Sequence, residues 1–258
     1  MVSHNFLSPI LTILTPLNYI TTSPLTTLSS QHLMELDSIF ERLLLLPLFQ
    51  GLSREELIRI VENVKFHFTN EPIFSTFQRQ SENAEHLRFL LQGKIQIKRK
   101  EADVEFIEIL EAPCVLFPEC LFGRQTKASH TCQTITEVNL LEITKHDFIY
   151  RLMDFTIFRI STLNYLCSLC YKNRKFDCHK FNALQTLFNF LDQQFMTKSG
   201  HKEVVVKLQT LANIIGISRL NTSHLLHRLE EANVLEMKRN KFVIPSFEKL
   251  EEFCKEPT

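Results

Sequence analysis

The chain has 258 residues, of which 44% are hydrophobic and 22% charged, a composition typical of a globular protein. Its 29 basic and 29 acidic side chains cancel overall. Residues 35–150 carry 13 basic and 18 acidic side chains, whereas residues 151–258 carry 16 and 11. This split, from −5 to +5, predicts an anionic partner for the C-terminal part. Only five glycines occur, and neither GxGxxG nor GxxxxGK is present, which excludes the glycine-rich phosphate loops.

Residues 1–34 contain no Asp, Glu, Lys or Arg, and Pro9, Pro16 and Pro24 interrupt their apolar runs. We therefore expect neither a secretory signal nor a membrane span there. The segment is predicted to be disordered or a non-native extension, with Met34 as an alternative start. An odd set of seven cysteines favours reduced thiols and a cytoplasmic location.

The next segment, residues 35–147, is predicted to form a small β-roll sensor domain. Apolar residues between 36 and 44 recur at helical spacing, and Ser53 with Glu56 forms a capping box for a short helix. Strands are indicated at 89–98, where Gly93 makes a turn, and also at 104–110 and 140–143. Several short strands at this spacing are typical of a roll or barrel.

Residues 148–176 are predicted to contain a long dimerisation helix. The stretch from Phe148 to Tyr171 is apolar on more than one helical face. Such a helix needs two partners, its own domain and a second subunit. The basic cluster at 172–175 is favourable at a helix C-terminus.

The last segment, residues 177–258, is predicted to be a DNA-binding domain. A short helix over 208–216 ends at Gly216, and Ser218 is an N-cap for a second helix. This is the pattern of a helix-turn-helix, and two short strands around 238–241 indicate a basic wing. Residues 204–245 carry six basic and three acidic side chains. The predicted DNA contacts are Ser218, Arg219, Asn221, Thr222, Ser223, His224, Arg228, Lys238, Arg239 and Lys241.

This order of elements resembles the Crp/Fnr superfamily. The motifs that carry the resemblance are the runs 46–52 (LPLFQGL), 89–93 (FLLQG), 211–219 (LANIIGISR) and 242–245 (FVIP). A weaker likeness, through 112–114, 172–173 and 224–226, is to the YeiL-type branch. The resemblance implies an α+β fold: a cupin-like, cyclic-nucleotide-binding-like β-roll, a long dimerisation helix and a C-terminal winged helix-turn-helix. It also implies a homodimeric transcription regulator that binds palindromic double-stranded DNA, and RNA polymerase if it is an activator.

Two positions depart from the nucleotide-binding members of that superfamily. Pro118-Glu119-Cys120 stands where they have Gly-Glu-Leu, and Ala128-Ser129 stands where an Arg holds the cyclic phosphate. The missing Arg weighs against cyclic-nucleotide binding, because its bidentate bond is hard to replace. The effector is therefore left open. The candidate effector pocket comprises Glu119, Cys120, Arg124, Lys127 and Ser129.

The resemblance implies that an iron–sulfur cluster would be held by cysteines near the N-terminus, as in Fnr-type members. Residues 1–113 contain no cysteine, so such a cluster is not expected. Structural or interface roles are favoured for the thiols, and no metal site is predicted. The redox candidates are Cys114, Cys120, Cys132, Cys167, Cys170 and Cys178. The alternative function is a redox- or ligand-sensing module whose helix-turn-helix binds another protein. The sequence shows no pairing of a nucleophile with a base of the kind that indicates an enzyme, so an enzyme is not predicted.

Overall fold

A computed structural model describes residues 41, 43–122, 126–174 and 182–255. Three predicted parts lie outside this range. They are residues 1–34, most of the helix predicted before residue 45, and residues 175–181, where the predicted dimerisation helix meets the predicted DNA-binding domain. Within the described residues, no helix is long and apolar enough to cross a membrane.

The N-terminal domain includes a capped helix, α3 (Arg54–Asn63). The hydroxyl of Ser53 accepts a hydrogen bond from the backbone of Glu56, and the Glu56 carboxylate accepts one from the backbone of Ser53. The predicted capping box is therefore confirmed. Buried Leu57 and Ile60 attach the helix to the roll.

Two antiparallel sheets form the roll. The first has the order β1-β8-β3-β6 and comprises His67–Glu71, Val138–Thr144, His86–Gln92 and Cys114–Leu116. The second includes β5-β4-β7-β2, comprising Val104–Glu111, Lys94–Glu101, Thr131–Thr134 and Thr76–Gln78. The predicted turn at Gly93 separates β3 from β4 with a φ of 96°. A Cβ there would lie 2.3 Å from the Glu137 carbonyl oxygen, so the turn requires glycine.

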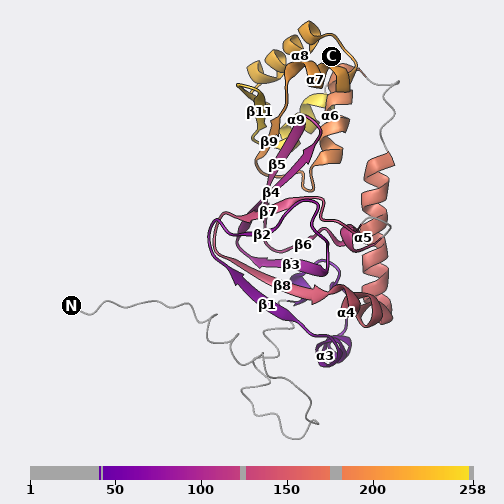
Figure 1. Cartoon of the computed structure of the whole chain (residues 1–258). Helices are drawn as coiled ribbons and strands as arrows, with labels where there is room; N and C mark the ends of the chain where they lie inside the picture. Colours follow the sequence, from indigo (N-terminus) through magenta and orange to yellow (C-terminus); the bar gives the residue numbers. More distant parts are fainter. Residues whose placement is uncertain (1–40, 42, 123–125, 175–181, 256–258) are drawn as a thin grey trace, which may run out of the picture.

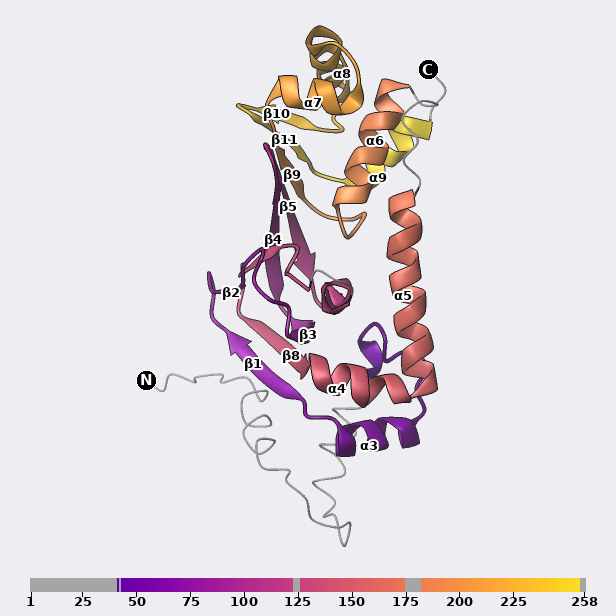
Figure 2. The same ribbon diagram turned by 45° about the vertical axis from the view of Figure 1, so that its right-hand side comes forward.

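The second sheet continues out of the roll into the C-terminal domain. Strand β9 (Lys202–Val205) pairs with β11 (Lys241–Ile244) on one edge and with β5 on the other. Val104 and Phe106 of β5 thereby join the apolar core of the C-terminal domain. Figures 1 and 2 show the long β4–β5 hairpin rising from the roll to meet β9.

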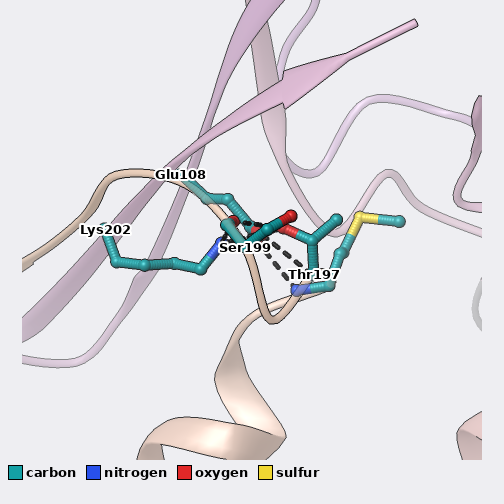
Figure 3. Close-up of polar contacts among 5 residues, drawn as sticks. Glu108, Thr197, Ser199 and Lys202 are labelled. Carbon is teal, nitrogen blue, oxygen red and sulfur yellow. Dashed lines mark hydrogen bonds and ion pairs between the residues drawn. The ribbon is translucent and has the colours of Figure 1, made fainter. Parts of the chain in front are cut away.

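A buried ion pair joins the two domains beside this strand pairing (Figure 3). The Nζ atom of Lys202 lies 2.6 Å from Oε1 of Glu108, and the two side chains are 0% and 2% exposed. Glu108 also accepts hydrogen bonds from the backbone N–H groups of Met196 and Thr197, at 2.8 and 2.9 Å. Lys202 donates to the Ser199 carbonyl and to the Thr197 hydroxyl. These bonds offset the cost of burying both charges.

The long helix predicted from Phe148 is divided in the structure. Its parts are α4 (Lys145–Tyr150), the short 3-10 helix η3 (Leu152–Asp154) and α5 (Thr156–Arg174). The rings of Phe148 and Phe158 lie 6.0 Å apart, although ten residues of straight helix would separate their Cα atoms by about 15 Å. The chain therefore turns so that both phenylalanines enter the core of the roll, and the predicted start at Phe148 was wrong.

Helix α5 has the two apolar faces that its sequence indicated. Phe158 and Thr162 are fully buried, and Tyr165 packs against the core of the roll. On another face, Ile160 and Leu163 are 47% and 49% exposed. In Figures 1 and 2, α5 runs along one side of the molecule from the roll towards the C-terminal domain.

The C-terminal domain comprises α6 (Ala183–Gln194), β9, α7 (Leu208–Ile215), α8 (Arg219–Glu231), β10 (Glu236–Lys238), β11 and α9 (Phe247–Lys255). Its core includes Leu187 of α6, Leu226 of α8 and Phe247 of α9. The helix-turn-helix and the two-stranded wing thus have the order that the sequence predicted.

Replacing Lys202 by Met should expose how much the domain junction depends on the buried pair. The change leaves the Glu108 carboxylate charged in a dry site, so the free energy of unfolding should fall by about 3–5 kcal/mol in urea titration. Adding Glu108→Gln removes the stranded charge but keeps an oxygen acceptor, and should recover more than half of the loss.

The matched control is Lys94→Met on the same hairpin. Lys94 pairs with Glu111 at 3.1 Å, but the side chains are 47% and 66% exposed, so the cost should stay below about 1 kcal/mol. Equal losses for Lys202→Met and Lys94→Met would contradict the role assigned to the junction.

Candidate functional site

The helix-turn-helix is built from α7 and α8 around a tight turn. Leu211, Ala212 and Ile215 form the buried face of α7. Gly216 ends the helix with a φ of 73°, in the left-handed region. The Ser218 hydroxyl then accepts a hydrogen bond from the Asn221 backbone at 3.2 Å and caps α8.

The solvent-facing side of α8 carries most of the predicted DNA contacts. Arg219, Asn221, His224 and Arg228 are exposed, and Ser223 is half-buried. Within the described chain, Arg219 makes no ion pair, so its guanidinium is available to a phosphate or a base edge. These side chains lie on the second helix of the motif, which is the helix that enters the major groove in such domains.

Thr222 requires a correction. It is fully buried, and its hydroxyl donates a hydrogen bond to the Ser218 carbonyl at 3.0 Å. The side chain therefore points into the domain, where it stabilises the first turn of α8. The prediction that Thr222 contacts DNA was therefore wrong.

The wing is the β10–β11 hairpin, with Arg239 exposed at its tip. Lys241 requires a second correction, because it is half-buried and its Nζ lies 2.7 Å from Oε2 of Glu203 on β9. Hydrogen bonds from Lys241 and His201 lower the pKa of Glu203. Lys241 therefore holds the wing to β9, and Lys238 has a looser contact of 3.7 Å with Glu236. Arg239 is the wing cation best placed for a phosphate.

The candidate effector pocket is only partly assembled in the structure. The thiol of Cys120 donates to the Ser129 hydroxyl at 3.3 Å, and that hydroxyl lies 2.8 Å from Nδ1 of His130. The His130 ring stacks on Phe117, with ring centres 4.3 Å apart. Cys120 and Ser129 are thus brought together as predicted, with an aromatic pair beside them.

Two of the other predicted pocket residues do not join this cluster. Glu119 and Lys127 are exposed, and Arg124 lies outside the described residues. Ala128, at the place of the family's phosphate-binding Arg, is 3% exposed and forms backbone hydrogen bonds with Ser81 and Glu82. Both backbone groups of Ala128 are therefore engaged by the chain itself and are not available to a ligand.

Helix α5 packs against the same part of the roll, because Tyr165 contacts the apolar core that includes Phe117 and Cys120. The Tyr165 side chain is largely shielded from water, and this burial raises its pKa, with smaller contributions from the nearby Glu119 and Cys114. Glu119 belongs to a short 3-10 helix, η2 (Pro118–Leu121). A change at the Cys120–Ser129–His130 cluster is thus positioned to act on α5.

The thiols fall into two environments. Burial raises the pKa of Cys114 and of Cys132 to about 12, and it also raises the pKa of Cys120, so all three stay protonated and poorly nucleophilic. Cys167 and Cys170 are exposed on α5. The other redox candidate, Cys178, lies outside the described residues.

Two buried residues, Glu108 and His130, were not predicted, although the sequence contains a signal for each. Glu108 occupies an inward position of the alternating strand 104–110, where a charge requires a buried partner. His130 directly follows Ser129, yet its burial was not inferred. Both gain their partners from segments distant in sequence: Lys202 for Glu108 and Phe117 for His130.

The fold and the exposed α8 define a class of protein: a β-roll followed by a long helix and a winged helix with a DNA-binding surface. The model of the Crp-like helix-turn-helix domain matches residues 184–253 of the chain. The resemblance to the Crp/Fnr superfamily is thereby confirmed in this domain, while the YeiL-type branch stays a prediction.

Solved structures of similar architecture match most of the chain. The catabolite activator protein of Thermus thermophilus is 19% identical, with a TM-score of 0.44, covering 81% of this chain and 98% of its own. The regulator DNR of Pseudomonas aeruginosa is 19% identical, with a TM-score of 0.39, covering 88% and 100%. CooA of Carboxydothermus hydrogenoformans is 18% identical, with a TM-score of 0.37, covering 81% and 96%. The search of curated proteins finds no match.

The buried His130 should make stability depend on pH. Burial, and to a smaller extent the charge of Arg99, lowers the pKa of His130 to about 3, whereas an unfolded histidine titrates near 6.5. Between these values the unfolded chain binds one more proton, so the folded state loses stability as pH falls below about 6.5. The contribution is about 1.4 kcal/mol per pH unit within that window.

The variant His130→Phe keeps a ring on Phe117 but removes the titrating group. Urea titrations at pH 7 and pH 5 should therefore show a smaller loss of unfolding free energy for this variant than for the wild type. His130→Gln, which is neutral and polar, should behave in the same way. An unchanged difference between the two pH values in both variants would rule out His130 as the source.

Proposed function

We propose that this protein is a homodimeric, Crp/Fnr-type transcription regulator of the cytoplasm that binds a palindromic DNA operator. The observation that carries the proposal is the capped, exposed N-terminus of α8 with Arg219, within a domain that matches the Crp-like helix-turn-helix. It is not proposed to be an enzyme. RNA polymerase is a further partner if the protein activates transcription.

DNA recognition would use two kinds of contact. Arg219, Asn221 and His224 on α8 supply donors and acceptors for base edges in the major groove. The α8 N-terminus and Arg239 at the wing tip are suited to phosphates, which position the domain without reading sequence. Because one domain has few free cations, two copies on one operator would double the electrostatic attraction.

Dimerisation would use the exposed face of α5. Two such helices side by side place one winged helix on each half of an operator, with half-sites about one DNA turn apart. Signalling would start in the roll, at the Cys120–Ser129–His130 cluster beside Tyr165 of α5. An effector that favours one arrangement of the domains would shift the population towards the DNA-binding form.

The domain junction offers a second path for this coupling. The Arg99 guanidinium of β4 lies 5.5 Å from the ring centre of Phe106. Phe106 in turn contacts Phe190 and Phe195 of the C-terminal domain, with ring centres 5.7 and 6.0 Å apart. The charge of Arg99 also contributes to the lowered pKa of His130, so Arg99 links the effector cluster electrostatically to these aromatic contacts.

Two single substitutions test DNA binding. Arg219→Ala should weaken binding to an operator selected from random duplexes by about 1–3 kcal/mol and relax the base preference at one position. Arg239→Ala should weaken binding to all sequences alike and lower the slope of log affinity against log salt by about one. Gel shifts over a salt series measure both effects.

The control is Lys249→Ala, which removes an exposed charge from α9 in the same domain and should leave binding unchanged. The alternative function, a sensing module whose helix-turn-helix binds a protein, predicts no salt-dependent binding to any duplex. Wild-type affinity in both arginine variants would likewise contradict the proposal.

A further inference from the structure

An apolar stripe lies on the exposed side of α5. It consists of Ile160, Leu163, Cys167 and Cys170, all of which are exposed. With a rotation of 100° per residue, this stripe lies on the side of the helix opposite to Phe158, Thr162 and Tyr165, which pack on the roll. The stripe therefore has no partner among the described residues of its own chain.

The spacing of the stripe indicates a second copy of the same helix. Positions 160, 163, 167 and 170 alternate steps of three and four, which is the core pattern of a two-stranded coiled coil. Arg159 is the only charged residue between 156 and 170, so two parallel copies meet little charge repulsion. A second copy of α5 is also the partner that the proposed homodimer requires, so the site described next rests on that proposed function.

We infer that Cys167 and Cys170 form a thiol–disulfide site across the two-fold axis of the dimer. In a parallel pair in register, each core residue faces its own counterpart, so Cys167 meets Cys167 of the partner subunit. Cys170 forms the next layer, about 4.5 Å further along the axis. Helix axes about 8–10 Å apart bring core Cα atoms near the roughly 4.4–6.8 Å that a disulfide spans.

The two thiols differ in access from the other cysteines that the structure describes. Burial raises the pKa of Cys114, Cys132 and Cys254, and their side chains are half-buried or buried. Cys167 and Cys170 are exposed in the single copy and become covered only when two helices associate. Oxidation at this site is therefore linked to assembly.

The reaction uses a small disulfide such as oxidised glutathione as the oxidant. The Cys167 thiolate attacks one glutathione sulfur, which forms a mixed disulfide and expels one glutathione thiolate. Cys167 of the partner subunit then attacks the protein sulfur of the mixed disulfide and expels the second glutathione. Two protein thiols are oxidised, one glutathione disulfide is reduced, and the two thiol protons end on two glutathione molecules. Cys170 can react in the same way.

The bond links the two α5 helices close to their C-terminal ends. Cys170 is four residues from the end of α5 at Arg174, and the C-terminal domain follows. A cross-link there prevents the dimer from dissociating on dilution. Because such bonds are reversible by thiols, the dimer would persist under oxidising conditions and exchange under reducing ones.

The test uses the full-length chain, reduced, desalted and incubated in glutathione buffers of graded ratio. After alkylation with N-ethylmaleimide, a non-reducing gel should show a band at about twice the 30.3 kDa of the chain, which dithiothreitol removes. Cys167→Ser/Cys170→Ser should stay at the single-chain mass, and Cys167→Ala/Cys170→Ala should do the same. Cys254→Ser is the matched control and should cross-link like the wild type.

Sedimentation and gel shifts of the reduced protein separate this inference from the proposed function. A reduced wild type that dimerises and binds operator but never cross-links would overturn the thiol site alone. Cross-linking that persists in both double variants, or a bond between Cys167 and Cys170 of one chain, would overturn it as well. A reduced protein that is monomeric and does not bind DNA would overturn the proposed function.

Discussion

The buried pair of Glu108 and Lys202 is the interaction on which the arrangement of the two domains depends. Neither charge is tolerable in a dry site without the other, so β5 of the roll and β9 of the winged helix must meet in one register. That register also delivers Val104 and Phe106 into the C-terminal core. One sheet therefore runs through both domains, and a movement of the winged helix requires either bending this sheet or breaking the pair.

Helix α5 supplies the second connection, and its position follows from the turn before it. Because the chain bends between α4 and α5, Phe148 and Phe158 both enter the roll, and one face of α5 is committed to the sensor domain. On the opposite face, Ile160 and Leu163 are exposed to solvent, and this is the face that the proposed dimer would bury. The same helix thus packs against the core of the roll through Tyr165, and its opposite face would contact the proposed dimer partner, so binding at one contact can influence the other.

The candidate DNA surface shows how far local sequence signals reach. Gly216 and Ser218 specify the turn and the cap of α8 by backbone geometry and one hydrogen bond, and both were predictable from neighbouring residues. Thr222 and Lys241 were not, since their roles depend on partners supplied by the fold. Helical rotation turns Thr222 into the domain, and the strand pairing places Lys241 beside Glu203. A polar residue in a recognition helix is therefore a weak indicator of contact until its burial is known.

The sequence by itself determined the order of the elements, the capping box at Ser53, the glycine turns at 93 and 216, and the two-faced character of the long helix. These features depend on hydrophobic period and on backbone conformations that few residues adopt. Only the tertiary structure decided that the helix breaks before Thr156, that Ala128 is buried and hydrogen-bonded to the segment of Ser81 and Glu82, and that Glu108 pairs with Lys202 across 94 residues. Such pairings join segments far apart in the chain, and no local pattern encodes which distant side chain completes a buried charge.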